Sequence, residues 1–303
     1  MRHINGIKEI VEKYDYFIID VWGVVHDGSS LYPQALETFQ YLNKIGKKIC
    51  FLSNAPRRAS KVAKTLNDFG ITPNLYEFIL TSGESSYIDL QQNQKNNFTN
   101  FGKNYFYIGP NKDIDLLDGL EYKEVGDPSQ ADFVLTTGFE NENSKISEKL
   151  PLAIQANEFK LPMLCVNPDL IVVKQNGIEM ICAGALAMEY QKIGGTVHYF
   201  GKPFSKVYQM VLEKFLITDK SKIIAIGDGL ETDIKGASDF KIDNILVTGG
   251  ILAKDLGIKF WQVAEDENLK KICNNYNIFP NYIISNLRIW NFIQKKEKAQ
   301  LKF

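Results

Sequence analysis

An aspartate stands directly after a short apolar run in the first part of this chain. Residues 16–19 form the run, Asp20 ends it, and Gly23 follows where the backbone can turn sharply. The pattern predicts a buried strand that delivers Asp20 to the carboxyl edge of a parallel sheet, where α/β enzymes hold their reacting groups. A carboxylate in that place could act as a nucleophile or bind a cation, although Asp also caps turns without any chemical role.

Three later apolar runs are also followed by polar residues that could reach the same edge. These are Ser53 and Asn54 after run 50–52, Lys202 after run 197–200, and Asp228 with Asp233 after run 223–226. Phosphoryl transfer needs a set of this kind: a nucleophile, positive charge against a dianionic substrate, and donors for the phosphate oxygens. The set therefore indicates a phosphoryl-transfer site.

Four of these residues can be given chemical roles. Asp20 would be the nucleophile and form an aspartyl phosphate, and Asp20 with Asp228 offers the hard oxygen ligands that suit Mg²⁺. Asp233 would orient the metal or its waters. Lys202 would add positive charge and help to keep Asp20 ionised.

The remaining polar residues would bind the substrate. Ser53, Asn54 and the backbone beyond them would donate to phosphate oxygens, while Arg57 or Arg58 would hold a distal anionic group. The structural alternatives are a solvated Lys202, Ser53 as a helix cap, and the two later aspartates as turn and capping residues.

Strands and helices alternate along the chain, and their order predicts how these residues meet. In the first part the predicted strands are 17–20, 48–52 and 78–81, the predicted helices are 33–45 and 56–69, and a further helix opens after residues 82–84. In the last part the predicted strands are 197–200, 222–226, 244–247 and 282–285, and the predicted helices are 205–215 and 235–240. Alternation at this spacing indicates right-handed crossovers and a parallel sheet.

A second alternating block, residues 84–195, interrupts this series. It contains predicted strands at 105–108, 132–136 and 163–166 and predicted helices at 142–157 and 183–192. We therefore predict a discontinuous α/β core, residues 1–83 and 196–303, with an inserted α/β domain between its two parts.

The strand-end pieces, in this order, resemble the four motifs of the haloacid dehalogenase (HAD) superfamily. The inserted block resembles the C2-type cap of the class IIA branch, which includes nucleotide-sugar and pyridoxal phosphate phosphatases. Asn167, Pro168 and Asp169 are similar to a tripeptide of that cap. The resemblance implies a Rossmann-like core, a Mg²⁺-dependent phosphatase activity through an aspartyl phosphate, and a homodimer formed through the cap.

One position departs from the pattern of the superfamily's phosphatases. They carry a second aspartate two residues after the nucleophile, which serves as acid and base, and here Trp22 stands in its place. The Trp22 carbonyl could still ligate Mg²⁺, but the side chain cannot exchange protons. His26 and Asp27 are the predicted substitutes, because the ordinary pKa of His suits proton transfer near neutrality. The pair could also simply shape a turn with Gly28.

Three functions follow from these observations. The first is a Mg²⁺-dependent phosphatase acting on a small phosphorylated metabolite. The second is a carbon-halogen hydrolase, since the superfamily's dehalogenases also lack the second aspartate, and the third is a non-catalytic protein that binds a phosphorylated ligand. Asp228 and Asp233 favour the first, because dehalogenases do not need a metal site.

Composition narrows the partners and the compartment. Lys and Arg number 35 against 36 Asp and Glu, and a net charge of -1 gives no indication of nucleic acid or an anionic membrane as a partner. The 45% of hydrophobic residues suffices for a sizeable core. We expect a cytoplasmic protein, because we find no apolar run of signal-peptide or membrane-spanning length. The four cysteines lie far apart and include no C-x-x-C pair, which favours reduced thiols over disulfides or a metal site.

Overall fold

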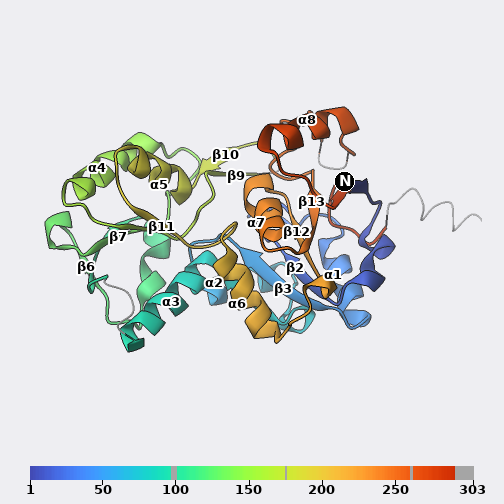
Figure 1. Ribbon diagram of the computed structural model, residues 1–303, viewed down its shortest axis with the longest axis horizontal. Helices are drawn as coiled ribbons and strands as arrows, with labels where there is room; N and C mark the ends of the chain where they lie inside the picture. Colours follow the sequence, from blue (N-terminus) through green and yellow to red (C-terminus); the bar gives the residue numbers. More distant parts are fainter. Residues whose placement is uncertain (97–100, 175, 260–261, 291–303) are drawn as a thin grey trace, which may run out of the picture.

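The computed structural model describes residues 1–96, 101–174, 176–259 and 262–290 (Figure 1). Two parallel sheets dominate it. One has seven strands in the order β1-β14-β13-β12-β2-β3-β4, and the other has five in the order β11-β8-β7-β5-β6. The prediction of an α/β fold with a parallel core sheet and an inserted α/β domain is confirmed.

The seven-stranded sheet joins segments from both parts of the core. Its strands are β1 (Arg2–His3), β2 (Tyr16–Ile19), β3 (Lys48–Ser53), β4 (Phe78–Thr81), β12 (Ile223–Gly227), β13 (Asp243–Val247) and β14 (Tyr282–Ile284). In the middle, β2 lies between β12 and β3, with Ile19 opposite Ile226 on one side and Phe51 on the other. The carboxyl ends of these three parallel strands therefore meet at one edge.

Helices cover both faces of this sheet. They are α1 (Ala35–Lys44), α2 (Ala59–Asp68), α6 (Ser205–Phe215), α7 (Lys235–Asp239) and α8 (Asp266–Tyr276), while α3 (Ser82–Asn96) follows β4 and packs on the cap. Phe17 and Ile19 of β2 join one buried cluster with Phe39 of α1, whereas Ile18 joins another with Val211 of α6. Successive strand residues point to opposite faces, so burial of both faces explains the uninterrupted apolar run that ends at Asp20.

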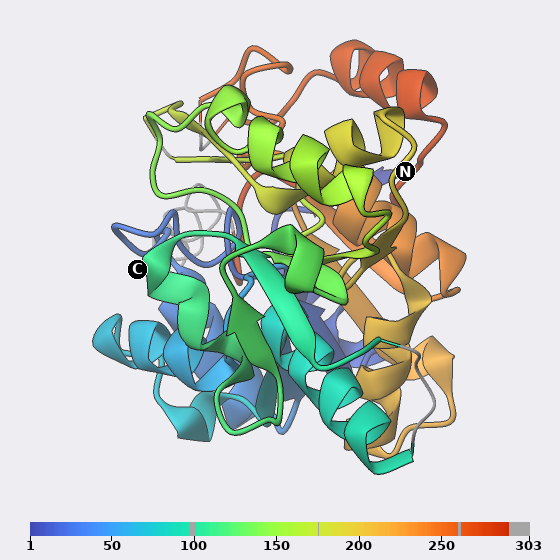
Figure 2. The ribbon, with the colours of Figure 1, turned by 90° about the vertical axis from the view of Figure 1, so that its left-hand side faces the viewer.

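The five-stranded sheet forms the inserted cap, which faces the viewer in Figure 2. Its strands are β5 (Asn104–Ile108), β6 (Lys123–Val125), β7 (Phe133–Thr136), β8 (Met163–Cys165) and β11 (Val197–Tyr199). The helices α4 (Leu150–Glu158) and α5 (Ala183–Lys192) pack on one face, and α3 lies on the other. Leu90 of α3 packs there with Leu135 and Leu164.

A short antiparallel hairpin, β9 (Ile171–Val173) and β10 (Glu179–Ile181), lies between the two sheets (Figure 1). Two hydrogen bonds between described residues join it to the core. The indole nitrogen of Trp22 donates to the carbonyl of Val173 at 2.9 Å, and Lys254 pairs with Glu179 at 2.7 Å.

The structure differs from the expected elements in three ways. The run 197–200, assigned to the core, forms β11, which pairs with β8 in the cap sheet, because an apolar run does not indicate which of two parallel sheets it joins. The predicted helix 142–157 begins only at Leu150, where Pro151 suits the first turn. The helix α8 and four short strands, β1, β6, β9 and β10, were not expected. The residue boundaries between the core and the inserted cap stay a proposal, with the second boundary moved to follow β11.

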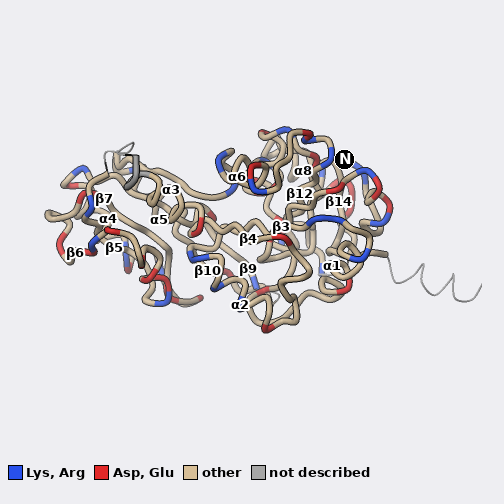
Figure 3. The backbone as a smooth tube through the Cα atoms, turned by 90° about the horizontal axis from the view of Figure 1, so that it is seen from below, with Lys and Arg blue, Asp and Glu red and all other residues tan. Residues whose placement is uncertain are grey.

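Charged residues of both signs are interspersed over the core and the cap (Figure 3). Within the described residues, no helix has the length and apolar character needed to cross a membrane.

Candidate active site

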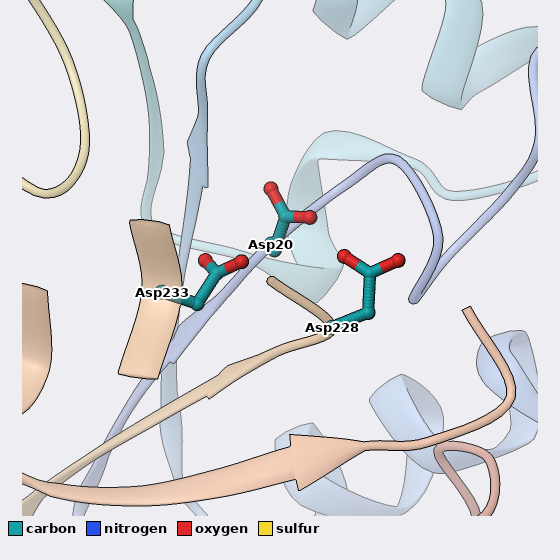
Figure 4. Close-up of side chains that lie close together, drawn as sticks. All are labelled: Asp20, Asp228 and Asp233. Atoms are coloured by element: carbon teal, nitrogen blue, oxygen red, sulfur yellow. The ribbon is translucent and has the colours of Figure 1, made fainter. Parts of the chain in front are cut away.

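Three carboxylates meet at the edge formed by β2, β12 and the turn after β12. Asp20 follows β2, Asp228 follows β12, and Asp233 stands in a π-helical turn, Leu230–Ile234. One oxygen from each lies within 4.8 Å of the others, and Figure 4 shows the side chains turned toward one another. Three carboxylates at this spacing form an oxygen-rich site of the kind that holds a hard divalent cation.

Burial and mutual repulsion make this cluster electrostatically costly by itself. Burial raises the pKa of Asp228 to about 7, with a further increase from the charge of Asp233. Burial also raises the pKa of Asp20 well above its usual value, although the charge of Lys202 opposes the rise. A bound divalent cation would relieve this repulsion, so the donor set fits the predicted Mg²⁺.

Lys202 is the single ammonium group in contact with the cluster within the described chain. Its Nζ donates to Asp20 Oδ1 at 2.5 Å and to Asp233 Oδ1 at 2.7 Å, and the residue is only 3% exposed. Burial alone would lower the pKa of Lys202, but Asp20 and Asp233 raise it above its usual value. Lys202 is therefore charged and is not the solvated lysine of the structural alternative.

Two glycines allow these groups to approach. Gly23 has a φ of +82°, and a Cβ on it would lie 2.0 Å from Asp228 Oδ2. Gly201 has a φ of +117°, and a Cβ on it would lie 2.0 Å from Ser82 Oγ and 2.5 Å from Asn54 Oδ1. Both positions need left-handed backbone and free space, which only glycine combines without strain.

Asn54 has a different place from the one expected. Its Oδ1 accepts from the Lys202 backbone at 2.8 Å and from Ser82 Oγ at 3.2 Å. Its Nδ2 donates to the Lys202 carbonyl at 3.1 Å and to Asp169 Oδ1 at 2.8 Å. The amide is thus occupied by the protein, and Asn54 positions the Lys202 loop instead of offering donors to a phosphate. Ser53 lines the cavity beside it, and its hydroxyl accepts from Ala55 N at 3.2 Å.

The two predicted substitutes for the missing aspartate are held in other interactions. His26 Nδ1 accepts from Gly28 N at 2.8 Å, and burial lowers the pKa of His26 to about 4, so the ring is neutral at pH 7. Asp27 Oδ1 accepts from Ser29 N and Ser30 N, each at 2.9 Å. The turn-shaping alternative fits this geometry better than proton donation, although His26 does line the cavity.

The site opens into a cavity of about 320 Å³ enclosed by both domains. The cap side is largely apolar, since the hairpin supplies Ile171, Val172, Val173, Met180 and Ile181. Arg57 lies in the opposite wall and faces Asp113 of the cap, with 3.3 Å between Nε and Oδ1. Arg58 is turned elsewhere and pairs with Glu84 of α3 at 2.8 Å. Of the two candidate arginines, only Arg57 lines the cavity.

Sequence reasoning missed several contributors to this cavity, among them the apolar hairpin, Asp113 and Asp169. Asp169 belongs to the tripeptide that carries the resemblance to a class IIA cap, and this was its only signal. The hairpin and Asp113 gave none, because their relation to Asp20 depends entirely on how the cap docks.

A parallel core with an inserted cap, and a lysine among three aspartates at the strand ends, defines a hydrolase of the haloacid dehalogenase type. Comparison with known proteins agrees. A family described as "Haloacid dehalogenase-like hydrolase" matches residues 17–123, and a second, HAD-hydrolase-like family matches residues 199–288. The chain belongs to the haloacid dehalogenase superfamily, class IIA.

Individual relatives extend along most of the chain. A 4-nitrophenylphosphatase of Schizosaccharomyces pombe is 26% identical, over 92% of this chain and 94% of its own. Phosphoglycolate phosphatase 2 of Arabidopsis thaliana is 24% identical, over 82% of this chain and 88% of its own. The crystal structure of a haloacid dehalogenase-like hydrolase from Brucella suis 1330 is 28% identical, with a TM-score of 0.79 over 94% of this chain and 99% of that one. The predicted enzyme class, a phosphatase of this family, is confirmed.

Proposed function

We propose that this phosphatase hydrolyses the monoester of a small phosphorylated metabolite through a phosphorylated Asp20 and depends on Mg²⁺. The observation that carries the proposal is the contact of one buried lysine with two of three clustered aspartates. Phosphatase relatives that cover most of the chain support it.

The arrangement suits displacement at phosphorus. An oxygen of Asp20 would attack the phosphorus atom, the bond to the leaving-group oxygen would break, and water would later release phosphate from Asp20. Lys202 Nζ holds the nucleophile 2.5 Å away, and the Ser53 hydroxyl can donate its hydrogen to a phosphate oxygen. Asp20, the Trp22 carbonyl, Asp228 and Asp233 would hold Mg²⁺, which supplies positive charge against the phosphate.

The cavity suggests a range of substrates. Its apolar hairpin side would accept the carbon skeleton of the leaving group, and Arg57 would accept a second anionic group. The substrates in the names of the relatives match these two features: 4-nitrophenyl phosphate has an apolar ring, and phosphoglycolate has a second anionic group.

A screen of phosphorylated metabolites with and without Mg²⁺ tests the proposal, with Asp20→Asn as the matched variant. Asn conserves shape, and Lys202 keeps its bond to Asp233, so the variant should fold. We expect turnover to fall at least ~10³-fold, as for loss of a covalent nucleophile. Wild-type turnover in the variant would contradict the mechanism. Metal-independent hydrolysis of a 2-haloacid would favour the alternative of a carbon-halogen hydrolase. Tight phosphate binding without turnover would favour the alternative of a non-catalytic binding protein.

A further inference from the structure

The proposed reaction lacks a proton donor at its usual position. An alkoxide leaving group needs a proton as its bond to phosphorus breaks, and a positioned acid typically contributes ~10² to 10⁴ in rate. Trp22 has only its indole N–H to offer, and that hydrogen is donated to the Val173 carbonyl at 2.9 Å. A protein side chain that supplies the proton must therefore come from another part of the cavity wall.

Most titratable groups that line the cavity already have a partner or a role. Asp20, Asp228, Asp233 and Lys202 form the cluster, Arg57 faces Asp113, Lys112 donates to the Glu140 carbonyl at 3.2 Å, and Cys182 Sγ donates to the Met180 carbonyl at 3.8 Å. His26 is neutral and its Nδ1 accepts from Gly28. Among the described lining residues this leaves Asp169, on the cap loop between β8 and the hairpin.

Asp169 is held so that one oxygen is fixed and the other is accessible. Asn54 Nδ2 donates to Oδ1 at 2.8 Å, and the backbone is anchored by Asp169 N to Asn167 Oδ1 at 3.1 Å and by Gly184 N to the Asp169 carbonyl at 3.1 Å. Within the described chain, Oδ2 accepts no hydrogen bond, and it is not among the buried unpaired atoms. A carboxyl group that lines the cavity with a free, accessible oxygen can exchange a proton there.

The surrounding charges suit the same task. Burial raises the pKa of Asp169 to about 6, the charge of Lys202 and the Asn54 hydrogen bond oppose the rise, and Asp233 adds to it. Asp228, Cys165 and Cys182 are the other titratable groups that interact with it. A carboxyl group in this range is both a competent acid and a competent base near neutrality.

We propose that Asp169 is the general acid and base of this enzyme, supplied by the cap in place of the aspartate that Trp22 replaces. In the first step the bond from phosphorus to the leaving-group oxygen breaks, and that oxygen takes the proton of the Asp169 carboxyl. In the second step water attacks the phosphorus of phospho-Asp20, its proton passes to the Asp169 carboxylate, and the bond between phosphorus and Asp20 breaks. This inference rests on the proposed phosphatase reaction.

The test is the dependence of kcat/KM on leaving-group pKa in Asp169→Asn, measured with aryl and alkyl phosphates of equal charge. An Asn can still accept from Asn54 Nδ2, so the cap loop should keep its position. We expect alkyl phosphates to lose ~10²-fold or more, and aryl phosphates with acidic leaving groups to lose much less. The change in kcat/KM with pH that is due to titration of Asp169 should disappear in the variant together with the alkyl phosphatase activity.

Two further variants keep the result interpretable. Asp113→Asn makes the same carboxylate-to-amide change in the same cap wall, and it should shift aryl and alkyl substrates of equal charge by one common factor. Adding Trp22→Asp to Asp169→Asn should restore part of the alkyl phosphatase activity, because a carboxyl group returns beside the nucleophile. An equal loss for all leaving groups in Asp169→Asn, with no rescue, would overturn the role of Asp169 and leave it a support for Asn54. A wild-type protein that hydrolyses no phosphate monoester would overturn both proposals.

Discussion

At the base of the cavity, three carboxylates share one ammonium group, and this imbalance governs what the site can bind. A phosphate dianion adds further negative charge, so Lys202 alone cannot compensate it. The site is suited to phosphate only together with a cation, which is the physical reason to expect metal dependence.

Asp228→Asn tests this expectation directly. Asn keeps an oxygen that can accept from Ile251 N, which Asp228 Oδ2 now does at 2.7 Å, so the loop should hold its shape. Losing a charged ligand should weaken Mg²⁺ binding at least ~10-fold and reduce activity with it. Calorimetric titration of Mg²⁺ measures the change. Asp239→Asn, at an exposed aspartate paired with Lys235, is the control, and equal affinity in all three proteins would move the metal elsewhere.

Arg57 of the core and Asp113 of the cap form a loose pair in the cavity wall. Arg57 Nη2 donates to Asp113 Oδ2 at 3.4 Å, whereas the buried Nε and Oδ1, 3.3 Å apart, make no hydrogen bond. Asp113→Asn should release Arg57 for a second anionic group on the substrate. We expect KM to fall several-fold, up to ~10-fold, for phosphate esters that carry a carboxylate, and to change less for neutral leaving groups.

The KM values of one carboxylated and one neutral ester measure this effect. Asp115→Asn, which alters a partly buried ion pair with Lys61, serves as the control. If both esters respond alike to Asp113→Asn, Arg57 does not bind the distal group.

Among the elements, the start of α2 depends on α3. Glu84 accepts from Arg58 Nε and from the backbone of Ala59, the first residue of α2, at 2.8 and 2.9 Å. Burial would raise the pKa of Glu84, but the hydrogen bonds from Arg58 and Ala59 lower it below its ordinary value. Glu84 therefore fixes the helix that follows Ser53 and Asn54.

Because this pKa is lowered in the folded state, the stabilisation is present at neutral pH and is lost as pH falls through the lowered pKa. Glu84→Gln should reduce the free energy of unfolding by ~1 to 2 kcal/mol at pH 7. The difference from wild type should shrink as the pH falls through the lowered pKa of Glu84. Urea denaturation over a series of pH values from neutral to acid measures it, and a difference independent of pH would contradict the assigned cause.

The sequence predicted those elements whose signals are local. The ends of β2, β3 and β12 are visible as apolar runs closed by polar residues, and α5 and α6 have the predicted bounds. The hairpin was not visible, because three-residue strands of intermediate burial carry no clear alternation. Local pattern does not specify features that depend on partners far away in the chain. These are the sheet that β11 joins, the hydrogen bonds of Asn54 and the place of Asp169.

At the scale of the whole molecule, the catalytic edge of the core is closed by the cap. Trp22 donates across this boundary to the Val173 carbonyl of β9, and its ring packs edge-on against His26, with 5.9 Å between ring centroids. Trp22, which stands where the superfamily's phosphatases carry their proton-donating aspartate, thus holds the hairpin over the cavity. A homodimer through the cap stays a prediction, to be tested by sedimentation.

Trp22→Phe should loosen the hairpin without unfolding either domain. The change keeps an aromatic ring but removes one hydrogen bond, worth ~0.5 to 1.5 kcal/mol. We expect amide exchange in residues 171–174 and 178–181 to speed up roughly 2- to 10-fold. Hydrogen exchange read by mass spectrometry checks this, with β7 and β8 as internal reference. Equal acceleration in those strands would mean a global loss of stability instead.

The pairing of β2 with β12 has a consequence for how the polypeptide matures. During synthesis, β2, β3 and β4 leave the ribosome long before β12. The edge of β2 that pairs with β12 therefore has no partner while the whole cap is being made. The cap has its own sheet and helices and can fold during that interval, whereas β2, β3 and β4 form a sheet whose β2 edge is unpaired and open to mispairing. Chains that stop before Ile223 should therefore depend on chaperones or aggregate, and Asp20 and Asp228 can come together only after the whole cap has been synthesised.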